Sequence, residues 1–200
     1  CPSEYTITRV WSVSDCAGNT TSHTQTITVE DTTAPTFVEA LPADATVECD
    51  NVPTADVLTA TDNCDANVTV SFTETLDGDA DACPSEYTIT RVWSVSDCAG
   101  NTTSHTQTIT VEDSTAPTFV ESLPTDATVE CDNVPTADVL TATDNCDANV
   151  TVSFDEQMID GSCPSNYVLV RTWSVTDCAG NTNTHIQNIT VQDTTAPTID

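Results

Sequence analysis

The chain repeats itself almost residue for residue, and this repetition constrains the fold more than any other feature. Residues 1–72 return as residues 83–154 with only three changes. Cys1, Cys83 and Cys163 mark repeat lengths of 82 and then 80 residues. Because one repeat has the length of a small domain, the chain is expected to form a row of similar modules rather than one large domain.

A short proline motif separates the repeats. Asp-x-Thr-Ala-Pro-Thr occurs at 31–36, 113–118 and 193–198, each time after a strand-like alternating run. Proline cannot donate to a sheet ladder and holds the preceding residue extended, which is typical of a short, straight spacer. The chain is interpreted as part of a longer array. Its predicted divisions are an incomplete module over 1–31, complete modules over 35–113 and 117–193, and the start of a further module over 194–200.

The charge of the chain argues against two classes of partner. It has 32 acidic residues and three arginines but no lysine, for a net charge of −29. Nucleic acids and anionic membranes both need clustered Lys and Arg, so neither is expected to bind. No apolar run approaches membrane-spanning length. Cations are the natural counterpart, although solubility or a saline habitat would explain most of this charge without any binding site.

The cysteines indicate a location outside the reducing cytosol. Ten of them recur at fixed spacing in modules of about 80 residues whose large aliphatic side chains are scarce. Small modules with small cores need covalent staples, and such disulfides persist in extracellular or cell-surface proteins.

Alternating patterns predict an all-β sandwich, and helical periods are absent. The strongest strand has Tyr87, Ile89, Arg91, Trp93 and Val95 on one face. A tight turn over 97–101 follows it, an acidic loop over 77–81 precedes it, and Gly100 or Asn101 is expected to take a positive φ there. For the module 35–113 the predicted strands are 36–41, 46–49, 56–61, 68–72, 87–95 and 104–111.

Alternating strand directions predict which loops meet, and therefore which cysteines can pair. The loop around Cys64, the turn around Cys98 and the incoming proline joint should share one end of the module, and Cys49 and Cys83 should share the other. A strand of about ten residues spans about 33 Å, too far for a bond from Cys83 to Cys98, because a disulfide tolerates only about 7 Å between Cα atoms. The predicted disulfides are Cys64–Cys98, Cys49–Cys83, Cys146–Cys178 and Cys131–Cys163. Local pairing of cysteines fifteen residues apart stays open, since spacing does not fix connectivity.

The same convergence of loops predicts a structural Ca²⁺ site at each joint. Ca²⁺ takes six to eight oxygen ligands, often carboxylates from separate loops. The candidate ligands of the first joint are Glu30, Asp31, Asp62, Asn63, Asp65, Asp97 and Asn101. Those of the second joint are Glu112, Asp113, Asp144, Asn145, Asp147, Asp177 and Asn181.

Other interpretations of these residues remain open. Asp-Asn and Asp-Cys-Ala-Gly-Asn segments also form turns in which the side chains cap backbone N–H groups. Zn²⁺ is not expected, because the histidines lie singly in strands and the cysteines are assigned to disulfides. No serine lies in a nucleophile elbow and no acid–base pair stands out, so the chain is not expected to be an enzyme.

Two residues of the strongest strand are interpreted as structural. Arg91 is the only basic residue of its module, and it is expected to lie near Trp93 and to pair with a carboxylate on a neighbouring strand. Trp93 is expected in the core, although a tryptophan could also stack against a sugar.

Four segments together resemble hyalin-type (HYR) repeats. They are the Asp-x-Thr-Ala-Pro joint, Leu-Pro-Ala-Asp-Ala-Thr-Val-Glu-Cys at 41–49, Ala-Thr-Asp-Asn-Cys at 60–64 and Trp-Ser-Val-Ser-Asp-Cys-Ala-Gly-Asn at 93–101. The resemblance covers essentially the whole chain. It is greatest to the cysteine-bearing arrays of Bacteroidota surface adhesins, including gliding-motility adhesins.

The resemblance implies tandem immunoglobulin-like β-sandwich modules joined end to end, with a role in adhesion or in extracellular filaments and no enzymatic activity. Thr32, Ser114 and Thr194 each follow an Asp and precede a Thr, which resembles the acceptor of O-glycans in Bacteroidota. These three residues are therefore candidate glycan sites.

The function predicted is that of a secreted or surface-bound stalk, stapled by disulfides and stiffened by Ca²⁺ at the joints, whose partners are the neighbouring modules. One alternative is an array that binds surface glycans through Trp and loop residues. Another is a filament of several like chains, assembled through the threonine-rich strand 104–111 as an exposed sheet edge.

Overall fold

The computed structural model describes residues 4–78 and 83–198, and these residues form strands and connecting loops without any helix. The chain opens with a hairpin of β1 (Tyr5–Ser14) and β2 (Thr20–Val29), which pair antiparallel. The acidic loop predicted over 77–81 falls partly on residues 79–82, which lie outside the described part.

The first full repeat contains a two-stranded and a four-stranded sheet. The two-stranded sheet pairs β3 with β5, and the larger sheet has the order β4-β8-β7-β6. The strands are β3 (Thr36–Phe37), β4 (Ala45–Glu48), β5 (Ala60–Thr61), β6 (Thr69–Asp77), β7 (Tyr87–Ser96) and β8 (Thr102–Glu112).

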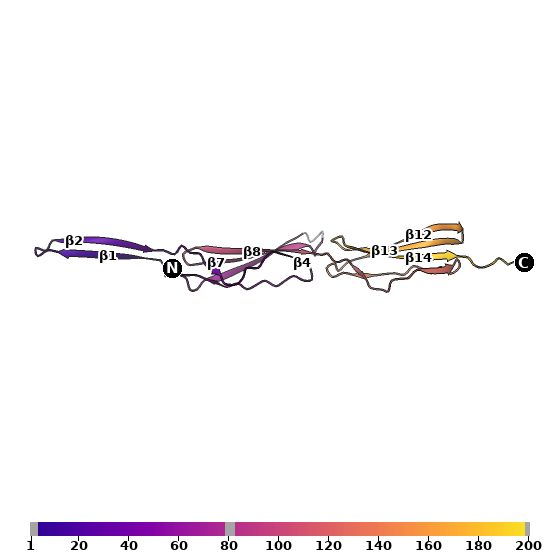
Figure 1. The fold of residues 1–200 in the computed structure, drawn as a ribbon, viewed down its shortest axis with the longest axis horizontal. Helices are drawn as coiled ribbons and strands as arrows, with labels where there is room; N and C mark the ends of the chain where they lie inside the picture. Colours follow the sequence, from indigo (N-terminus) through magenta and orange to yellow (C-terminus); the bar gives the residue numbers. More distant parts are fainter. Residues whose placement is uncertain (1–3, 79–82, 199–200) are drawn as a thin grey trace. The chain divides into compact units, whose positions relative to one another are not determined.

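The second repeat reproduces this arrangement, with β11 paired to β9 and a larger sheet of order β10-β14-β13-β12. Figure 1 labels β12, β13 and β14, three neighbouring strands of this larger sheet. The short strand β10 runs parallel to the last strand β14, and the other neighbours in this sheet are antiparallel. The strands are β9 (Thr118–Phe119), β10 (Ala127–Glu130), β11 (Ala142–Thr143), β12 (Val152–Cys163), β13 (Asn166–Thr176) and β14 (Thr182–Gln192). The all-β, immunoglobulin-like sandwich expected from the sequence is confirmed.

The core lies on one face of each large sheet. Trp93 of β7 and Ile109 of β8 are 1% and 0% exposed, and Trp173 and Ile189 repeat these values in the second repeat. In the hairpin β1–β2 the equivalent Trp11 is 53% exposed. The tryptophan is therefore buried by the segment that covers the sheet and not by the hairpin that carries it, which confirms its assignment to the core.

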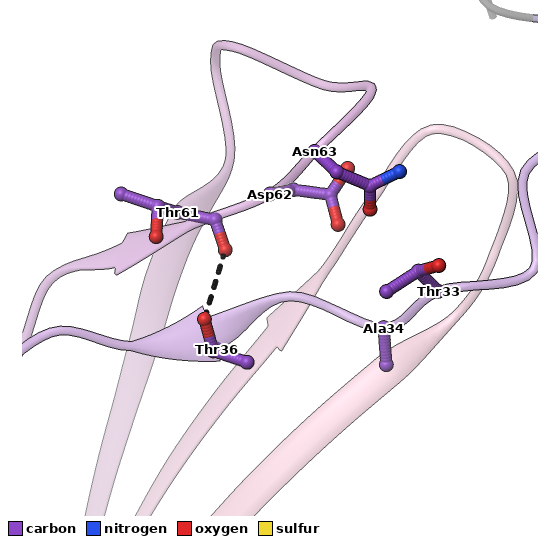
Figure 2. Close-up of a pocket in the computed structure, with 6 residues that line it drawn as sticks. All are labelled: Thr33, Ala34, Thr36, Thr61, Asp62 and Asn63. Carbon is purple, nitrogen blue, oxygen red and sulfur yellow. Dashed lines mark hydrogen bonds between the residues drawn. The ribbon is translucent and has the colours of Figure 1, made fainter.

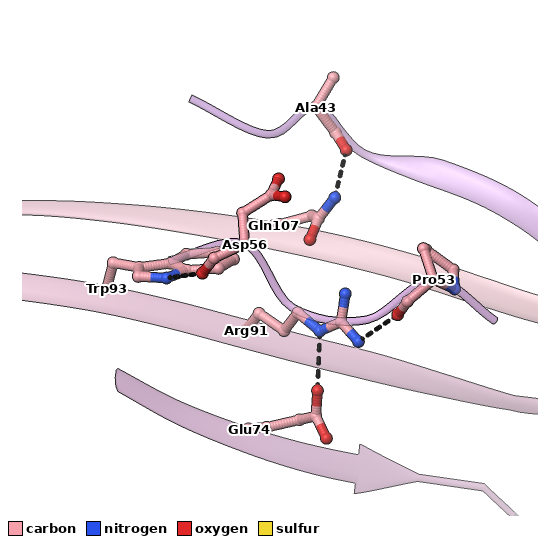
Figure 3. A network of polar contacts seen from close by, with 7 residues as sticks. All are labelled: Ala43, Pro53, Asp56, Glu74, Arg91, Trp93 and Gln107. Atoms are coloured by element: carbon pink, nitrogen blue, oxygen red, sulfur yellow. Dashed lines mark hydrogen bonds and ion pairs between the residues drawn. The ribbon is translucent and has the colours of Figure 1, made fainter. Parts of the chain in front are cut away.

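The segment that covers the sheet is less regular than predicted. Strands were expected over 36–41 and 56–61, whereas β3 and β5 each have only two residues. The carbonyl groups of this segment are used differently: Trp93 Nε1 donates to Asp56 O at 3.1 Å, and Arg91 Nη2 donates to Pro53 O at 2.7 Å (Figure 3). Backbone acceptors that serve buried side chains in this way are not available for a sheet ladder.

Arg91 is the centre of a polar network inside the core. Its guanidinium is buried, and Nε donates to the Glu74 carboxylate of the adjacent strand β6 at 2.7 Å. Gln107, on the neighbouring strand β8, donates to Ala43 O at 2.7 Å (Figure 3). The predicted structural role of the arginine is confirmed, and Arg171 with Glu156 repeats the ion pair at 2.6 Å.

Strand 104–111 corresponds to β8, which lies between β4 and β7 and not at the end of its sheet. β4 has only four residues whereas β8 has eleven, so β4 covers only part of that side of β8. Assembly of several chains through the uncovered part of this strand stays a prediction.

The compact units do not coincide with the sequence repeats. One unit comprises Cys1–Ala45, Pro53–Asp77 and Thr88–Ile109, and the other comprises Thr46–Val52, Gly78–Tyr87 and Thr110–Asp200. The second unit thus combines three segments of the first repeat, among them the end of β8, with the whole of the second repeat. This composition bears directly on the cysteines described below.

Removal of the Glu74 carboxylate should leave a buried guanidinium without its ionic partner. We expect Glu74→Ala to lower the free energy of unfolding by about 1–3 kcal/mol, because an unsatisfied buried donor costs this much. Denaturant unfolding measures the loss. Asp77→Ala, on the same exposed edge of β6 and without an ion pair, is the matched control and should change stability by less than about 0.5 kcal/mol. An equal loss in both variants would contradict a specific role for the ion pair.

Glu39 and Glu121 should make the fold sensitive to acid. The backbone N–H of Thr59 donates to Glu39 at 2.6 Å and its hydroxyl at 2.7 Å, and these bonds hold the pKa of Glu39 below the ordinary glutamate value of 4.5. Thr141 does the same for Glu121. A lowered folded pKa gives stability that is present above 4.5 and is lost as pH falls through the folded pKa.

Glu39→Gln with Glu121→Gln should therefore flatten the decline in thermal midpoint below pH 4.5, relative to the unmodified chain. Glu86→Gln, whose side chain has no hydrogen bond to any described residue, is the control and should leave the acid limb unchanged. An acid limb that is equally steep in the double variant would refute the assignment.

Candidate functional site

Three loops of the first unit meet at one end of the sheet, as the strand directions predict. The joint brings Asp31, the loop after β5 brings Asp62, and the turn between β7 and β8 brings Asp97. That turn depends on Gly100, which has a φ of 93°. Asn101 ties the turn to the joint, because its Nδ2 donates both to Asp31 O at 3.2 Å and to Asp97 Oδ2 at 2.8 Å.

The carboxylates of Asp31, Asp62 and Asp97 form a close trio. One oxygen of each lies within 4.8 Å of the others. Asp31 is 6% exposed and Asp97 is 7% exposed. Oδ1 of Asp31 accepts from Thr33 N at 3.1 Å, whereas Oδ2 of Asp31 and Oδ2 of Asp62 are buried without a hydrogen-bond partner. Figure 2 shows Asp62 turned toward the joint across an open pocket of about 320 Å³.

A second trio in the other unit repeats this geometry. Asp113, Asp144 and Asp177 again lie within 4.8 Å of one another, and Oδ2 of Asp113 and of Asp144 are buried without a partner. Asn181 Nδ2 donates to Asp113 O at 3.0 Å and to Asp177 Oδ2 at 2.9 Å. The same carboxylate oxygens are therefore without a partner at both joints, as expected of nearly identical repeats.

These trios concentrate negative charge without compensation from the protein. The ion pairs among the described residues are Arg91–Glu74 and Arg171–Glu156, and neither involves a trio. Carboxylates whose oxygens lie this close together repel each other when both are ionised. A bound cation would remove this repulsion.

The pKa values show how burial and hydrogen bonds act in opposite directions at the trios. Desolvation raises the pKa of Asp113, and the charges of Asp144, Asp177 and Glu48 raise it further. Desolvation also acts on Asp97, but hydrogen bonds from Asn101 and from backbone N–H groups of the turn outweigh it, so the pKa of Asp97 is lowered.

Several predicted ligands have other tasks in the structure. Asp65 Oδ1 accepts from Asn67 N at 3.0 Å within the loop, and its Oδ2 accepts from Cys98 N at 3.1 Å, which holds the loop against the turn. Asp147 does the same in the second unit. Asn63 and Asn145 each donate to the sulfur of the next residue. Glu30 and Glu112 are exposed and lie outside the trios.

Glu48 is a neighbour of the second trio that sequence reasoning missed. One of its carboxylate oxygens lies within 4.8 Å of Asp113 and of Cys146, although that sulfur is in a disulfide and cannot act as a thiolate ligand. Glu48 also accepts from Ser114, through both its N–H and its hydroxyl. The sequence argument paired Cys49, the residue that follows Glu48, with Cys83 of the same repeat, so nothing in it placed Glu48 beside Asp113.

The candidate O-glycan residues are partly engaged. The Ser114 hydroxyl donates to Glu48 and the Thr194 hydroxyl donates to Glu130. Thr32 has no such bond to a described residue and is exposed. Glycosylation of these residues stays a prediction.

The predicted disulfides within one repeat are wrong. Cys49 is bonded to Cys146 and Cys83 to Cys178, across 97 and 95 residues, with Cα–Cα distances of 5.9 and 5.2 Å. Both bonds lie in the second compact unit and join consecutive sequence repeats. The predicted pairs Cys49–Cys83 and Cys146–Cys178 are therefore excluded.

The remaining predicted pairs are also not formed. Cys131 and Cys163 are exposed thiols, and so is Cys16. Cys98 is in a disulfide, whereas Cys64 keeps a titratable thiol whose pKa is raised by desolvation and by the charges of Asp31, Asp62 and Asp97. The pairings Cys131–Cys163 and Cys64–Cys98 are thus wrong as well.

The physical reason for this correction is the shortness of the joint. The sequence argument placed Cys49 and Cys83 at one end of the first repeat, and Cys146 and Cys178 at the opposite end of the second. It treated each repeat as closed. A spacer of a few extended residues instead brings these two ends into one compact unit, where Ser85 Oγ also donates to Cys146 O at 2.8 Å.

Comparison with known proteins supports a family assignment. Residues 37–111 and 119–191 each match the family model described as an HYR-like domain with 4 cysteines. A search of curated proteins found no match. Among the described residues, no helix has the length and apolar character needed to cross a membrane.

Solved cadherin structures are similar to the chain at low identity. Drosophila N-cadherin EC1-4 has a TM-score of 0.33 and 14% identity, covering 95% of this chain and 58% of its own. Protocadherin gamma C5 EC1-3 has a TM-score of 0.37 and 12% identity, covering 94% and 78%. Mouse PcdhgC3 EC1-3 has a TM-score of 0.35 and 14% identity, covering 96% and 77%.

Digestion of the unreduced protein should reveal the disulfides that join the repeats. Because the chain has no lysine and only three arginines, cleavage after glutamate is more informative than trypsin. We expect fragment 49–74 to remain joined to 131–156, and fragment 75–86 to 157–200. Mass spectrometry before and after reduction identifies the pairs. Fragment 131–156 joined to 157–200 instead would contradict the structure, because only pairing within the second repeat produces it.

Proposed function

Because the chain belongs to the family of HYR-like domains with 4 cysteines, we propose that it is a stalk segment of an extracellular adhesin or surface filament. Tandem repeats of this family with disulfides fit a structural role of the adhesion type and an extracellular location. Such repeats are typically non-enzymatic adhesion modules. The finer proposal is that two disulfides and one Ca²⁺ tie each repeat to the next. The bacterial setting implied by the resemblance stays a prediction.

The covalent part of this proposal rests on where the disulfides lie. Both bonds connect consecutive repeats, so they add nothing to the closure of either sandwich but restrain the joint at two points. A single disulfide would still allow one repeat to rotate about that bond relative to the next. Two bonds on different strand ends remove that freedom, which suits a stalk rather than a flexible tether.

The ionic part rests on one observation, the buried and unpaired carboxylate oxygens of Asp31, Asp62, Asp113 and Asp144. A buried polar oxygen without a partner is costly, and a cation that several carboxylates share would satisfy it. The donor set is entirely oxygen, which suits Ca²⁺ and does not suit Zn²⁺. Asp31, Asp62 and Asp97 would hold one ion, and Asp113, Asp144 and Asp177 a second.

Capping of the turn accounts for only one of the two carboxylate oxygens of Asp62. Asp62 Oδ1 accepts from the backbone of Cys64 and of Asp65, both at 2.9 Å, as expected of a turn-forming aspartate. Its Oδ2 has no such task and is buried. A residue that served only the turn could be an asparagine, which offers the same acceptor without the charge.

Glycan binding through tryptophan has little support. Trp93 and Trp173 are each 1% exposed, and their indole N–H groups already donate to backbone carbonyls. A sugar cannot stack on a ring that the covering segment buries.

Calcium should bind the chain at two sites and stabilise it. We expect calorimetric titration to give two Ca²⁺ per chain and the thermal midpoint to rise relative to chelator. The stabilisation should be about 2.7 kcal/mol for each site at a free Ca²⁺ concentration one hundred times the dissociation constant. Failure of the unmodified chain to bind Ca²⁺ would remove the ionic part of the proposal.

Asp62→Asn with Asp144→Asn sharpens this test. Asparagine keeps the oxygen that caps the turn and removes the charge, so Ca²⁺ binding should be lost while the thermal midpoint in chelator is unchanged or higher. Asp50→Asn with Asp132→Asn, in exposed turns, is the matched control and should bind two Ca²⁺. A lower midpoint in chelator for the first pair would assign these aspartates to the turns instead.

A further inference from the structure

We propose that Cys131 and Cys163 are the outgoing half of a further double disulfide, and that their partner is another copy of the same repeat. The structure shows the complete form of this joint once, at Cys49 and Cys83. Cys131 and Cys163 occupy the same places in the next repeat. The proposal rests on the covalent part of the proposed function and is independent of Ca²⁺.

The pair Cys49 and Cys83 and the pair Cys131 and Cys163 occupy equivalent positions in the structure as well as in the sequence. Cys49 directly follows β4 and Cys131 directly follows β10. Cys83 precedes β7, and Cys163 ends β12 just before β13. In the first repeat both cysteines bond to the following repeat, at Cys146 and Cys178, and not to each other. If Cys131 and Cys163 pair in the same way, their partners are the residues equivalent to Cys146 and Cys178 in a following copy of the repeat.

The hydrogen bonds around the outgoing end are already those of the complete joint. Glu130 accepts from the N–H and the hydroxyl of Thr194, as Glu48 accepts from Ser114. Asp193 Oδ1 accepts from Thr195 N at 3.0 Å, as Asp113 Oδ1 accepts from Thr115 N at 3.1 Å. The hydrogen bonds of Glu130 and Asp193 thus match those of Glu48 and Asp113 in the complete joint.

What differs between the two ends is exposure. Cys83 and Asp113 are each 5% exposed where the following repeat packs against them. Their equivalents Cys163 and Asp193 are exposed. A following copy would bury both residues. It would also place its own Asp144 and Asp177 beside Asp193, as Asp144 and Asp177 lie beside Asp113 in the complete joint.

Cys16 supports the same pattern from the incoming side. It lies in the turn between β1 and β2, where Cys98 and Cys178 lie in the later repeats. Both of those cysteines are in disulfides, whereas Cys16 is an exposed thiol. It would accept a bond from the Cys163 position of a preceding copy.

Formation of each bond is a two-electron oxidation. Two thiols lose two protons and two electrons, a sulfur–sulfur bond forms, and a disulfide oxidant accepts the electrons and protons to become two thiols. Oxidised glutathione serves as this oxidant in the test below, giving two reduced glutathione molecules for each bond.

The test extends the chain by one repeat. Residues 119–200 are joined again after Thr198, so that the copy follows a complete proline joint, and Ala148→Ser in the copy marks its fragment by mass. The extended chain is refolded with reduced and oxidised glutathione, alkylated and cleaved after glutamate. We expect fragment 131–156 to carry two links, one to fragment 49–74 and one to the copy's marked fragment. Cys163 should be linked to the copy's Cys178.

The unextended chain is the control, and in it Cys131 and Cys163 should both be alkylated. In the extended chain their alkylation should be lost. Cys131→Ala in the extended chain should expose the copy's Cys146 to alkylation and leave the Cys163 link in place. This selective effect is not expected of random cross-linking.

Two failures are distinguishable. If Cys49–Cys146 and Cys83–Cys178 form but Cys131 and Cys163 are alkylated or bonded to each other, the further inference is overturned and the proposed function stands. If none of the bonds between repeats forms, both are overturned.

Discussion

Each large sheet is buried on one face only, beneath a segment that has little secondary structure of its own, and the rest of the molecule depends on this constraint. The covering segment is held by side chains from below, with Arg91 and Trp93 donating to its carbonyls. A core of this kind contains few large side chains, and its stability depends on polar contacts that must all be satisfied. Arg91 and Gln107 are accordingly almost fully buried, and each has a hydrogen-bond partner.

The joint between the repeats also depends on specific contacts rather than on apolar packing, and here they are disulfides and clustered carboxylates. A small sandwich offers little apolar surface at its ends, so an end-to-end contact cannot depend on hydrophobic burial alone. Cys49 and Cys83 supply bonds instead, and Asp113 contributes a buried carboxylate oxygen that has no hydrogen-bond partner among the described residues. The near identity of the repeats has a structural benefit here, because each end must fit the opposite end of its neighbour.

The sequence predicted much of the fold and less of the joint. Strand β7, its turn at Gly100 and the meeting of Asp31, Asp62 and Asp97 follow from period-two patterns and strand directions, which are local or nearly local signals. The shortness of β5 could not be predicted from the local sequence. It depends on tertiary contacts, in which Arg91 and Trp93 donate to the carbonyls of Pro53 and Asp56. The disulfides were missed for a different reason. The ends of Cys49 and Cys83 were assigned correctly, but their partners lie in the following repeat, and spacing within one repeat carries no information about its neighbour.

The two disulfides also limit how far the chain could extend if it were pulled by its ends. One covalent route crosses from Cys49 directly to Cys146 and continues along the chain to Cys178, and the other continues from Cys49 to Cys83 and crosses there to Cys178. Either route is far shorter than the chain between Cys49 and Cys178. The residues between these two cysteines cannot be drawn out to their full length until a sulfur–sulfur bond breaks, so the extension of this part of the chain is limited by covalent bonds rather than by folding.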